Sequence, residues 1–565
     1  MKKNQIIECV PNFSEGVNMQ IINQITHEIS SVEGVKLLDV DPGKATNRTV
    51  VTMVGHPKDV IEAAFLAIKK AAELIDMRHH KGEHPRMGAT DVCPLIPIAN
   101  ISMVETAEYA HKLAKRVGEE LNIPVYMYEQ AATNEERRNL ATVRAGEYEG
   151  FVEKIKIPNW KPDYGAATFN AKSGATAIGA RKILVAYNVN LNTTSERRAN
   201  SVAFDVREQG RVSRVNDEVT GEIITDANGE PMREPGTCKA VKGIGWYIPE
   251  YGIAQVSMNL TDTDITPLHI AFEACVDSAH KRGMRVTGSE LVGLVPKNVL
   301  VDAGKYFLEK QERSTGVSEA ELIHIAIKSM GLDDLTPFDP NKKIIEYCMA
   351  EENANPLVGM SLVKFANETA SESIAPGGGS VSAYVATLGV SLGAMVANLS
   401  GHKRGWDHRW KEFSTWADIG QAIKDRLLGL VDEDTRSFNA IIDAMRLPKT
   451  NDEEKKKRSE AIQNATKYAI EVPFTVMNTA NEAYELITEM VNEGNPNSIT
   501  DAGVGALCIN TAIQGAWLNV LVNMSGFKDE KYKSELMEKG KTISAESVIK
   551  SQSIVDVVKQ KMQII

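Results

Sequence analysis

The sequence has few of the features that would assign it to several protein classes at once. Its 565 residues include only six cysteines, and no two of them form a CxxC pair: Cys9, Cys93, Cys238, Cys275, Cys348 and Cys508. Scattered cysteines are typical of reduced thiols rather than of a disulfide framework or a zinc site. The first residues also lack the long apolar run of a signal peptide. We therefore expect a cytoplasmic protein without structural disulfides.

Positive charge is scarce as well. Lys and Arg total 64 against 75 Asp and Glu, which gives a net charge of −11. An acidic chain of this kind is a poor candidate for binding nucleic acid or an anionic membrane. Any anionic ligand must therefore meet a local cluster of basic residues.

One uncharged stretch, residues 377–401, is long enough to span a bilayer. It is rich in Ala, Gly and Ser and has no flanking belt of aromatic residues. Small residues also let helices pack closely inside a protein. We therefore expect a buried helix of a soluble bundle and no membrane span.

The apolar pattern of the first third alternates between strand and helix periods. It predicts strands over 6–10, 35–40 and 49–54 and helices over 18–31 and 59–75. The same order then returns, with strands over 182–191, 243–248 and 253–260 and helices over 195–209 and 267–282. The turn-rich segment 215–237 is predicted to be a surface hairpin inserted into the second half.

This pattern predicts a multidomain fold class. Two related α/β subdomains of the βαββαβ type, each with helices on one face of a mixed sheet, precede an all-α helical bundle. The predicted boundaries are 1–181 and 182–348 for the two subdomains, 349–359 for a linker and 360–565 for the helical domain.

The loop at residues 78–88 gathers three of the eleven histidines of the chain. His80, Glu83 and His84 fit the H-x-x-E-H pattern of some zinc peptidases. That pattern needs a continuous helix, and Gly82 and Pro85 interrupt it. We expect no metal here, and instead a rigid loop that presents one histidine beside cations, although a plain solvated loop is the alternative. Histidine can exchange a proton near neutral pH.

The Gly/Ala/Thr/Ser-rich segment 165–181 precedes a predicted strand. It lacks the G-K-[ST] of a phosphate loop, and it does not lead from a strand into a helix as a dinucleotide fingerprint does. Its composition suits backbone contact with a flat ligand.

A predicted helix around residues 425–445 carries an apolar seam with steps of four and three: Leu427, Val431, Asp434, Phe438, Ile441 and Met445. A carboxylate in such a seam is costly unless it is paired, and its pKa tends to rise. Asp434 is therefore either a paired structural residue or a tuned acid/base, and Asp432 is predicted to lie off the seam. Gly377, Gly378, Gly379 and Ser380 open another helix, whose N–H groups either bind an anionic ligand group or serve only close packing.

Several motifs resemble known families. The segments ECVPNFSEG at 8–16, LLDVDPGKATNRTV at 37–50, KGEHPRMGATDVCPLIP at 81–97, RAGEYEG at 144–150 and GIGWY at 243–247 resemble glutamate formimidoyltransferase. The segments APGGGSVSA at 375–383 and MRLPK at 445–449 resemble formimidoyltetrahydrofolate cyclodeaminase. Together they cover nearly the whole chain in the order of the bifunctional formimidoyltransferase-cyclodeaminase family. The 215–237 insertion is longer than we expect for animal members.

The resemblance implies two reactions. The first moves the formimino group from N-formimino-L-glutamate to N5 of tetrahydrofolate, and the second cyclises the product to 5,10-methenyltetrahydrofolate with release of ammonia, as in histidine degradation. The family's catalytic positions fall on His84 and Asp434. Its folate-binding segment falls on Gly165, Ala166, Ala167, Thr168, Phe169, Asn170, Ala171, Lys172, Ser173 and Gly174.

The substrates carry carboxylates, so basic residues near these motifs are candidate clamps. By their chemistry we assign this role to Arg48, Lys81 and Arg86 in the first domain, and to Arg446 and Lys449 for the glutamyl tail of folate. The resemblance further implies polyglutamylated tetrahydrofolate as co-substrate, no metal, and a ring-shaped octamer built from dimers. Two alternatives stay open: a transferase fused to a methenyltetrahydrofolate cyclohydrolase-like domain, and a non-catalytic folate-binding assembly protein.

Overall fold

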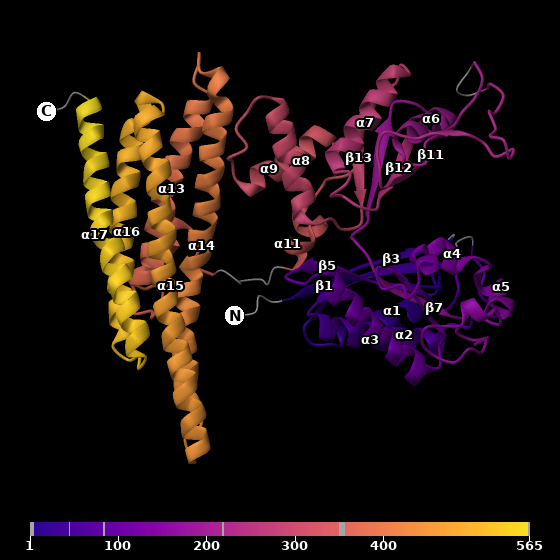
Figure 1. Ribbon diagram of the computed structural model, residues 1–565, viewed down its shortest axis with the longest axis horizontal. Coiled ribbons are helices and arrows are strands. Elements are labelled where there is room, and N and C mark those ends of the chain that lie inside the picture. The colour runs from indigo at the N-terminus through magenta and orange to yellow at the C-terminus, as the bar shows by residue number, and fades with distance from the viewer. Residues whose placement is uncertain (1–4, 45, 83–84, 217–219, 350–355, 563–565) are drawn as a thin grey trace. The chain divides into compact units, whose positions relative to one another are not determined.

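The computed structural model describes residues 5–44, 46–82, 85–216, 220–349 and 356–562 (Figure 1). It divides into two compact units. The first comprises Met1–Val299 with Met330–Met349, and the second comprises Leu300–Ser329 with Ala350–Ile565.

The first unit opens with a seven-stranded sheet. Its strands are β1 (Ile6–Cys9), β2 (Asn12–Phe13), β3 (Val35–Gly43), β4 (Arg48–Gly55), β5 (Thr90–Ala99), β6 (Val125–Glu129) and β7 (Thr176–Ala180). β3, β4, β1 and β5 lie side by side in antiparallel register, and β7 and β6 extend this sheet in parallel. The sheet is therefore mixed, as the sequence predicted.

Helices cover one face of this sheet. They are α1 (Met19–Ser30), α2 (Pro57–Leu74) and α3 (Met103–Leu121), and their apolar residues share one buried core with the strands. Asn18 caps the start of α1, and Ser102 and Glu105 form a capping box at the start of α3. On the other face, α4 (Leu140–Arg144) and α5 (Glu147–Lys154) contribute to a smaller core with Tyr126 and Tyr128 of β6.

A second sheet of four strands repeats the order of the antiparallel strands β3-β4-β1-β5 of the first. Its strands are β8 (Val185–Leu191), β11 (Val241–Ile248), β12 (Ile253–Leu260) and β13 (Val286–Val292), in the order β11-β12-β8-β13. With α6 (Glu196–Val206) and α7 (Leu268–Lys281) this is the predicted βαββαβ unit. The mixed sheet expected here is wrong, because every pairing is antiparallel. The first compact unit of the molecule ends with α10 (Pro340–Lys343) and α11 (Ile345–Met349).

The segment 215–237 largely follows its predicted hairpin. Its strand β10 (Arg233–Glu234) pairs with β9 (Arg211–Val212), which precedes the segment, and isolated bridges join Arg214 to Ile223 and Thr225 to Pro231. Residues 217–219 lie outside the described residues.

The second unit is helical. It contains α8 from Leu300 onward, the whole helix being Lys297–Lys310, and α9 (Glu319–Met330) up to Ser329. It also contains α12 (Leu362–Thr369), α13 (Gly378–Gly401), α14 (Trp410–Arg446), α15 (Asp452–Glu493), α16 (Ile499–Met524) and α17 (Glu530–Lys561). The expectation of a helical region after the linker is confirmed.

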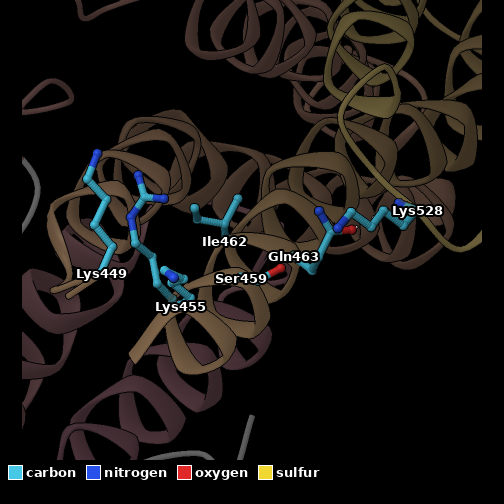
Figure 2. A pocket seen from close by; sticks show the side chains of 7 residues that line it. Lys449, Lys455, Ser459, Ile462, Gln463 and Lys528 are labelled. Carbon is cyan, nitrogen blue, oxygen red and sulfur yellow. Dashed lines mark hydrogen bonds between the residues drawn. The ribbon is translucent and has the colours of Figure 1, made fainter. Parts of the chain in front are cut away.

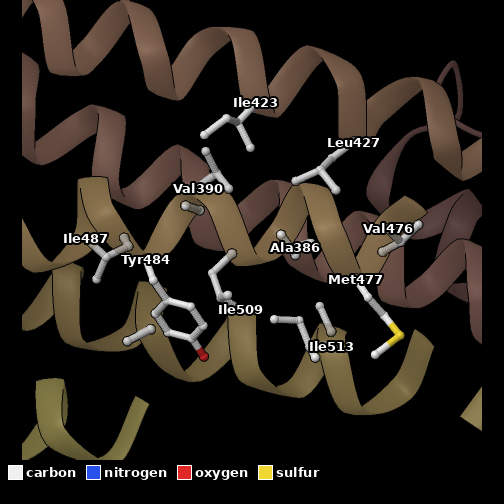
Figure 3. Packing of buried hydrophobic residues seen from close by; sticks show 14 of the residues in the cluster. Ala386, Val390, Ile423, Leu427, Val476, Met477, Tyr484, Ile487, Ile509 and Ile513 are labelled. Carbon is white, nitrogen blue, oxygen red and sulfur yellow. The ribbon is translucent and has the colours of Figure 1, made fainter. Parts of the chain in front are cut away.

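The core of this bundle lies among α13, α14, α15 and α16 (Figure 3). Small residues of α13 allow its backbone to approach its neighbours: a Cβ at Gly389 would lie 2.9 Å from the carbonyl oxygen of Gly505. By length and composition alone, α13 and the segment Pro496–Met524 could each cross a membrane. In their most apolar windows, 61% and 44% of the residues are buried inside the unit, as in the core helices of a bundle.

The apolar seam of α14 is buried only in part. Leu427 and Val431 are fully buried, but Phe438 is 43% exposed and Met445 is 53% exposed. The apolar seam predicted for this helix is therefore packed along only part of its length. The reason is the length of the α14–α15 hairpin, whose tip extends beyond the ends of the neighbouring helices (Figure 1).

Candidate active sites

Three loops of the first unit meet at one end of the mixed sheet. Ser14 donates its hydroxyl to the carbonyl oxygen of Gly88 at 2.7 Å. The amide of Gly16 donates to Oδ1 of Asn47 at 2.9 Å, and Nδ2 of Asn47 donates to the carbonyl oxygen of Lys81 at 2.8 Å. The segments that carry the PNFSEG, ATNR and KGEHPRMG motifs are therefore joined in space.

Arg86 is held by two carboxylates of α5. Its guanidinium bonds Glu149 at 2.6 and 2.8 Å and Glu147 at 3.1 Å. Glu149 raises the pKa of Arg86, and in turn Arg86 lowers the pKa of Glu149. Only 8% of Arg86 is exposed, so its charge is already matched inside the protein. The geometry suits a residue that holds the loop, and a direct clamp on substrate stays a prediction.

A second ion pair lies beneath the same loops. Arg144 bonds the fully buried Asp91 at 2.6 Å, and Asp91 also accepts the amide of Met87 at 3.0 Å. Arg48 lies nearby and donates to Oδ1 of Asn12. Burial lowers the pKa of Arg48 to about 10, and Asp91 opposes this shift. Arg48 thus remains a cation at neutral pH.

The segment 165–174 packs against the same region. Tyr148 donates to the carbonyl oxygen of Ala171 at 2.5 Å, and its ring lies 5.5 Å from that of Phe169. Gly174 has φ +67°, and a Cβ there would lie 2.2 Å from the carbonyl oxygen of Met87. The backbones of this segment and of the histidine loop therefore cross in direct contact.

Several groups of this segment face solvent: Ala166, Ala167, Thr168, Ala171 and Lys172. A ligand can thus reach its backbone. The ammonium of Lys172 donates to the carbonyl oxygen of Glu73 at 2.8 Å, and the amide of Ser173 donates to Asn170 at 2.9 Å. The segment is held from both sides while its middle stays open.

The predicted catalytic residue His84 lies outside the described residues, as does Glu83. Their flanking residues Gly82 and Pro85 are described, and both are exposed. Among the described residues, no group of three or more His, Cys, Asp or Glu side chains could hold a metal ion. The two ring nitrogens of His80 are already engaged, one with Arg86 and the other with Asn47.

In the second unit, Asp434 faces the start of α13. Its Oδ2 accepts the backbone N–H of Ser380 at 2.8 Å and the Ser380 hydroxyl at 3.1 Å. Burial raises the pKa of Asp434, and the two bonds from Ser380 oppose the shift. The net effect is a raised pKa, which is the property expected of a carboxylate that exchanges protons.

The glycines before Ser380 leave room for this carboxylate. A Cβ at Gly379 would lie 2.1 Å from Oδ1 of Asp434, and one at Gly378 would lie 3.1 Å from Nδ2 of Asn519. No neighbour lies within 4 Å of a Cβ built at Gly377 in the described structure. Ser380 thus binds Asp434 directly, whereas the role of the three glycines in binding a ligand stays a prediction.

Asp432 corrects one expectation. It is only 2% exposed, and its carboxylate accepts the backbone N–H groups of Leu357 at 2.8 Å and Val358 at 3.2 Å. It is therefore a buried structural residue, although the sequence placed it off the apolar seam. On the same helix, Asp443 is exposed and pairs with Arg446 at 3.4 Å.

The other predicted tail residue, Lys449, lines a basic pocket at the tip of the α14–α15 hairpin (Figure 2). The pocket has a volume of about 390 Å³ and is lined by Lys449, Lys455, Arg458, Ser459, Ile462, Gln463 and Lys528. Lys455 also pairs with Asp452 at 2.9 Å. Within the described part of the chain, Lys449 and Lys528 form no ion pair.

Comparisons with known proteins agree with this division. Family models match over residues 6–181 (formiminotransferase domain, N-terminal subdomain), 186–350 (formiminotransferase domain) and 361–542 (formiminotransferase-cyclodeaminase). The formimidoyltransferase-cyclodeaminase of Gallus gallus is 42% identical over 532 residues, which cover 94% of each chain. The chain belongs to the formimidoyltransferase-cyclodeaminase family. This confirms the resemblance that the motifs indicated.

Shorter relatives match each part of this family member. The glutamate formimidoyltransferase of Streptococcus pyogenes serotype M1 is 41% identical and covers 54% of this chain and 95% of its own. The methenyltetrahydrofolate cyclohydrolase of Methylorubrum extorquens is 31% identical over 198 residues, 35% of this chain and 95% of its own.

Sequence reasoning missed several residues of the first site. Asn47, Asp91 and Arg144 join loops that are far apart in the chain, and no periodic pattern marks them. Arg144, Glu147 and Glu149 lie within the RAGEYEG motif, which was noticed but given no role. Their pairing with a predicted cation or its loop is the signal that could have identified them. That pairing is visible in the structure and not in the sequence.

Proposed function

We propose that this enzyme transfers the formimino group from N-formimino-L-glutamate to N5 of tetrahydrofolate in its first unit. Its helical unit then cyclises 5-formiminotetrahydrofolate to 5,10-methenyltetrahydrofolate and ammonia. Both steps would belong to histidine degradation and one-carbon metabolism. The observation that carries the second step is Asp434, a mostly buried carboxylate with a raised pKa that Ser380 holds at the start of α13.

In the transfer step, N5 of tetrahydrofolate attacks the formimino carbon and glutamate leaves through its amino nitrogen. N5 loses a proton and the leaving nitrogen gains one, so a residue that exchanges protons near neutral pH can serve both events. We assign this role to His84. Arg48 and Lys81 supply positive charge for the substrate carboxylates, and the open backbone of 165–174 receives the folate.

In the cyclisation step, N10 attacks the carbon of the protonated formimino group. One proton must then pass from N10 to the departing nitrogen, which leaves as ammonia. Asp434 can carry that proton, because its Oδ2 is fixed by Ser380 and the absence of a side chain at Gly379 lets the carboxylate reach the start of α13. Its raised pKa brings the carboxyl closer to the working pH, which favours proton transfer in both directions.

The cyclohydrolase relative supports one alternative for the helical unit, hydrolysis of methenyltetrahydrofolate. The two candidates differ in one product, because only cyclodeamination releases ammonia. The test supplies formiminoglutamate and tetrahydrofolate and measures glutamate, ammonia and the absorbance of methenyltetrahydrofolate. Release of glutamate without ammonia would reject cyclodeamination, and release of neither would favour a non-catalytic folate-binding protein.

Two variants assign the residues. His84→Ala is expected to lose transfer by roughly 10²- to 10⁴-fold and to keep cyclisation of supplied 5-formiminotetrahydrofolate. Asp434→Asn should do the reverse, with accumulation of that intermediate. Asp443→Asn, on the exposed side of the same helix, is the matched control. If Asp434→Asn and Asp443→Asn cyclise at similar rates, Asp434 is not the proton carrier.

The co-substrate is proposed to be polyglutamylated, with the basic pocket at the hairpin tip as the site of its tail. Asp434 and Arg446 lie twelve residues apart on α14, about 18 Å along the helix axis. Only the far carboxylates of an extended tail would reach the pocket from Asp434. Lys449→Gln with Lys528→Gln should raise KM for a pentaglutamyl substrate roughly two- to fivefold per charge removed. KM for the monoglutamyl form should stay unchanged, and Lys539→Gln serves as the control.

We further propose a cytoplasmic homo-oligomer, an octamer built from dimers. The support is an exposed apolar stripe on two adjacent helices of the bundle: Leu388, Met395 and Leu399 on α13, and Val504, Leu507, Leu518 and Val522 on α16. Exposed apolar side chains gathered on neighbouring helices are typical of interfaces with another protein or a second copy. Leu518→Glu should lower the molecular mass that light scattering measures, because it places a charge in the proposed interface. An unchanged mass would exclude this face as an interface.

A further inference from the structure

We infer that His80 and Asn47 are positioning residues for the transfer reaction, because together they fix the loop on both sides of residues 83 and 84. The inference rests on the proposed transferase function and on the assignment of His84. It concerns residues to which the resemblance gives no role.

The hydrogen bonds of His80 determine its protonation state. Nδ1 of His80 accepts from Nε of Arg86 at 3.3 Å, and Nε2 lies 2.9 Å from the main-chain carbonyl oxygen of Asn47. A guanidinium can only donate and a carbonyl can only accept. His80 is therefore the neutral ring with its proton on Nε2. With both nitrogens engaged, it is not available as the proton carrier of the reaction.

Asn47 joins three stretches of backbone. Its Oδ1 accepts the amide of Gly16, its Nδ2 donates to the carbonyl oxygen of Lys81, and its own carbonyl oxygen accepts from His80. These contacts need φ +48° at Asn47, a left-handed conformation that asparagine tolerates better than most residues. The side chain and the main chain of one residue thus hold the same loop.

The far end of the loop is held as firmly. Arg86 donates to His80 and is itself bound to Glu147 and Glu149 of α5. Between the two ends, Gly82 packs so closely that a Cβ would lie 2.3 Å from the carbonyl oxygen of Thr46. The His80–Arg86 bond thus joins the two described sides of the loop. A displacement of about 1 Å in a catalytic group can cost roughly 100-fold in rate, so fixed flanks have a direct value for catalysis.

The test compares two His80 variants in the full-length enzyme. His80→Gln keeps one donor and one acceptor, whereas His80→Phe keeps the ring volume and loses both bonds. We expect His80→Phe to lower kcat of transfer roughly 10- to 100-fold with KM nearly unchanged, and His80→Gln to restore most of kcat. Thermal unfolding of the full-length variants, compared with the wild type, reports whether the first unit has folded. Equal activity of the two variants, or a loss that appears only in KM, would overturn the inference.

Asn47→Asp provides a second, independent variant. It keeps the acceptor for the amide of Gly16 but replaces the donor to the carbonyl oxygen of Lys81 with an oxygen. Like His80→Phe, it should lower kcat of transfer. Combined with His80→Phe, its effect should be less than multiplicative, because both residues act on one loop.

His84→Ala, measured in parallel, separates this inference from the proposed function. If His84→Ala is inactive while His80→Phe is normal, only the inference fails. If His84→Ala is active while His80→Phe is impaired, the assignment of His84 fails, and the inference that His80 positions the loop for His84 fails with it.

Discussion

At the scale of single residues, burial raises the pKa of the two carboxylates Glu8 and Asp434. Glu8 lies on β1 and is only 4% exposed, and burial raises its pKa to about 7 against the opposing influence of Arg181. The pKa of Asp434 is raised for the same reason, but two hydrogen bonds from Ser380 oppose the shift. A donor pair aimed at a carboxylate thus limits how far burial can shift it.

Glu8 gives the clearest prediction for stability. Its folded pKa is raised above the ordinary value, so its stabilising contribution is complete below about pH 4 and is lost as the pH rises through about 7. Glu8→Gln should therefore match the wild type in acid and be more stable above pH 7, by at most roughly 3 kcal/mol. Urea unfolding of the two proteins across pH 4–8 measures the difference. A gap that does not change with pH would contradict the raised pKa.

Sequence reasoning at this scale worked where a pattern was local. The steps of four and three found Asp434, whose carboxylate is indeed mostly buried. The same reasoning misjudged Asp432, because its partners Leu357 and Val358 lie 75 and 74 residues away in the chain. Pairing across such a separation leaves no trace in periodicity.

At the scale of elements, the start of α13 is shaped to receive a side chain from α14. Gly379→Ala tests this fit. Alanine is favoured over glycine in helices by up to about 1 kcal/mol, so the helix itself should not suffer. The added Cβ would meet Oδ1 of Asp434 at 2.1 Å, and we expect cyclisation to fall at least about tenfold while transfer continues.

Gly429→Ala is the matched control, because a Cβ at that position of α14 meets no described atom within 4 Å. Ammonia release and glutamate release, measured on one preparation, distinguish the two activities. A normal rate for Gly379→Ala would mean that Asp434 can move away without loss, and the fixed geometry would then have no role in the reaction.

The elements themselves were largely predictable, because each strand and helix is specified by its own apolar period. The strands and helices of the two βαββαβ units lie close to their predicted ranges, and the chain after the linker is helical as predicted. The direction of strand pairing was not predictable for the second sheet, since periodicity reports which face of a strand is buried and not which neighbour it pairs with. The exposure of Phe438 and Met445 escaped for a similar reason: it depends on where neighbouring helices end.

At the scale of the whole molecule, the two candidate sites are built from separate parts of the chain. A mixture of His84→Ala and Asp434→Asn enzymes tests whether each site is complete by itself. The second variant should make 5-formiminotetrahydrofolate, and the first should convert it, so methenyltetrahydrofolate should appear after a lag that shortens as protein concentration rises. Each variant alone should make almost none. If the mixture is as inactive as its components, the intermediate is not released to a second molecule.

The projecting tip of the α14–α15 hairpin also has a consequence for how the molecule opens locally. Residues near Leu427 and Val431 have a packed environment, whereas Phe438 and Met445 have one side in water. Amide hydrogen exchange should therefore speed up along α14 towards Arg446, because segments with few buried contacts open at lower cost. Lys449, Lys455 and Arg458 of the basic pocket lie at this end of the hairpin, and Lys528 lies between α16 and α17. A polycarboxylate that binds there loses part of its binding free energy to the ordering of the hairpin. Its binding should therefore slow amide hydrogen exchange at the tip and leave the exchange rates in the buried half of α14 unchanged.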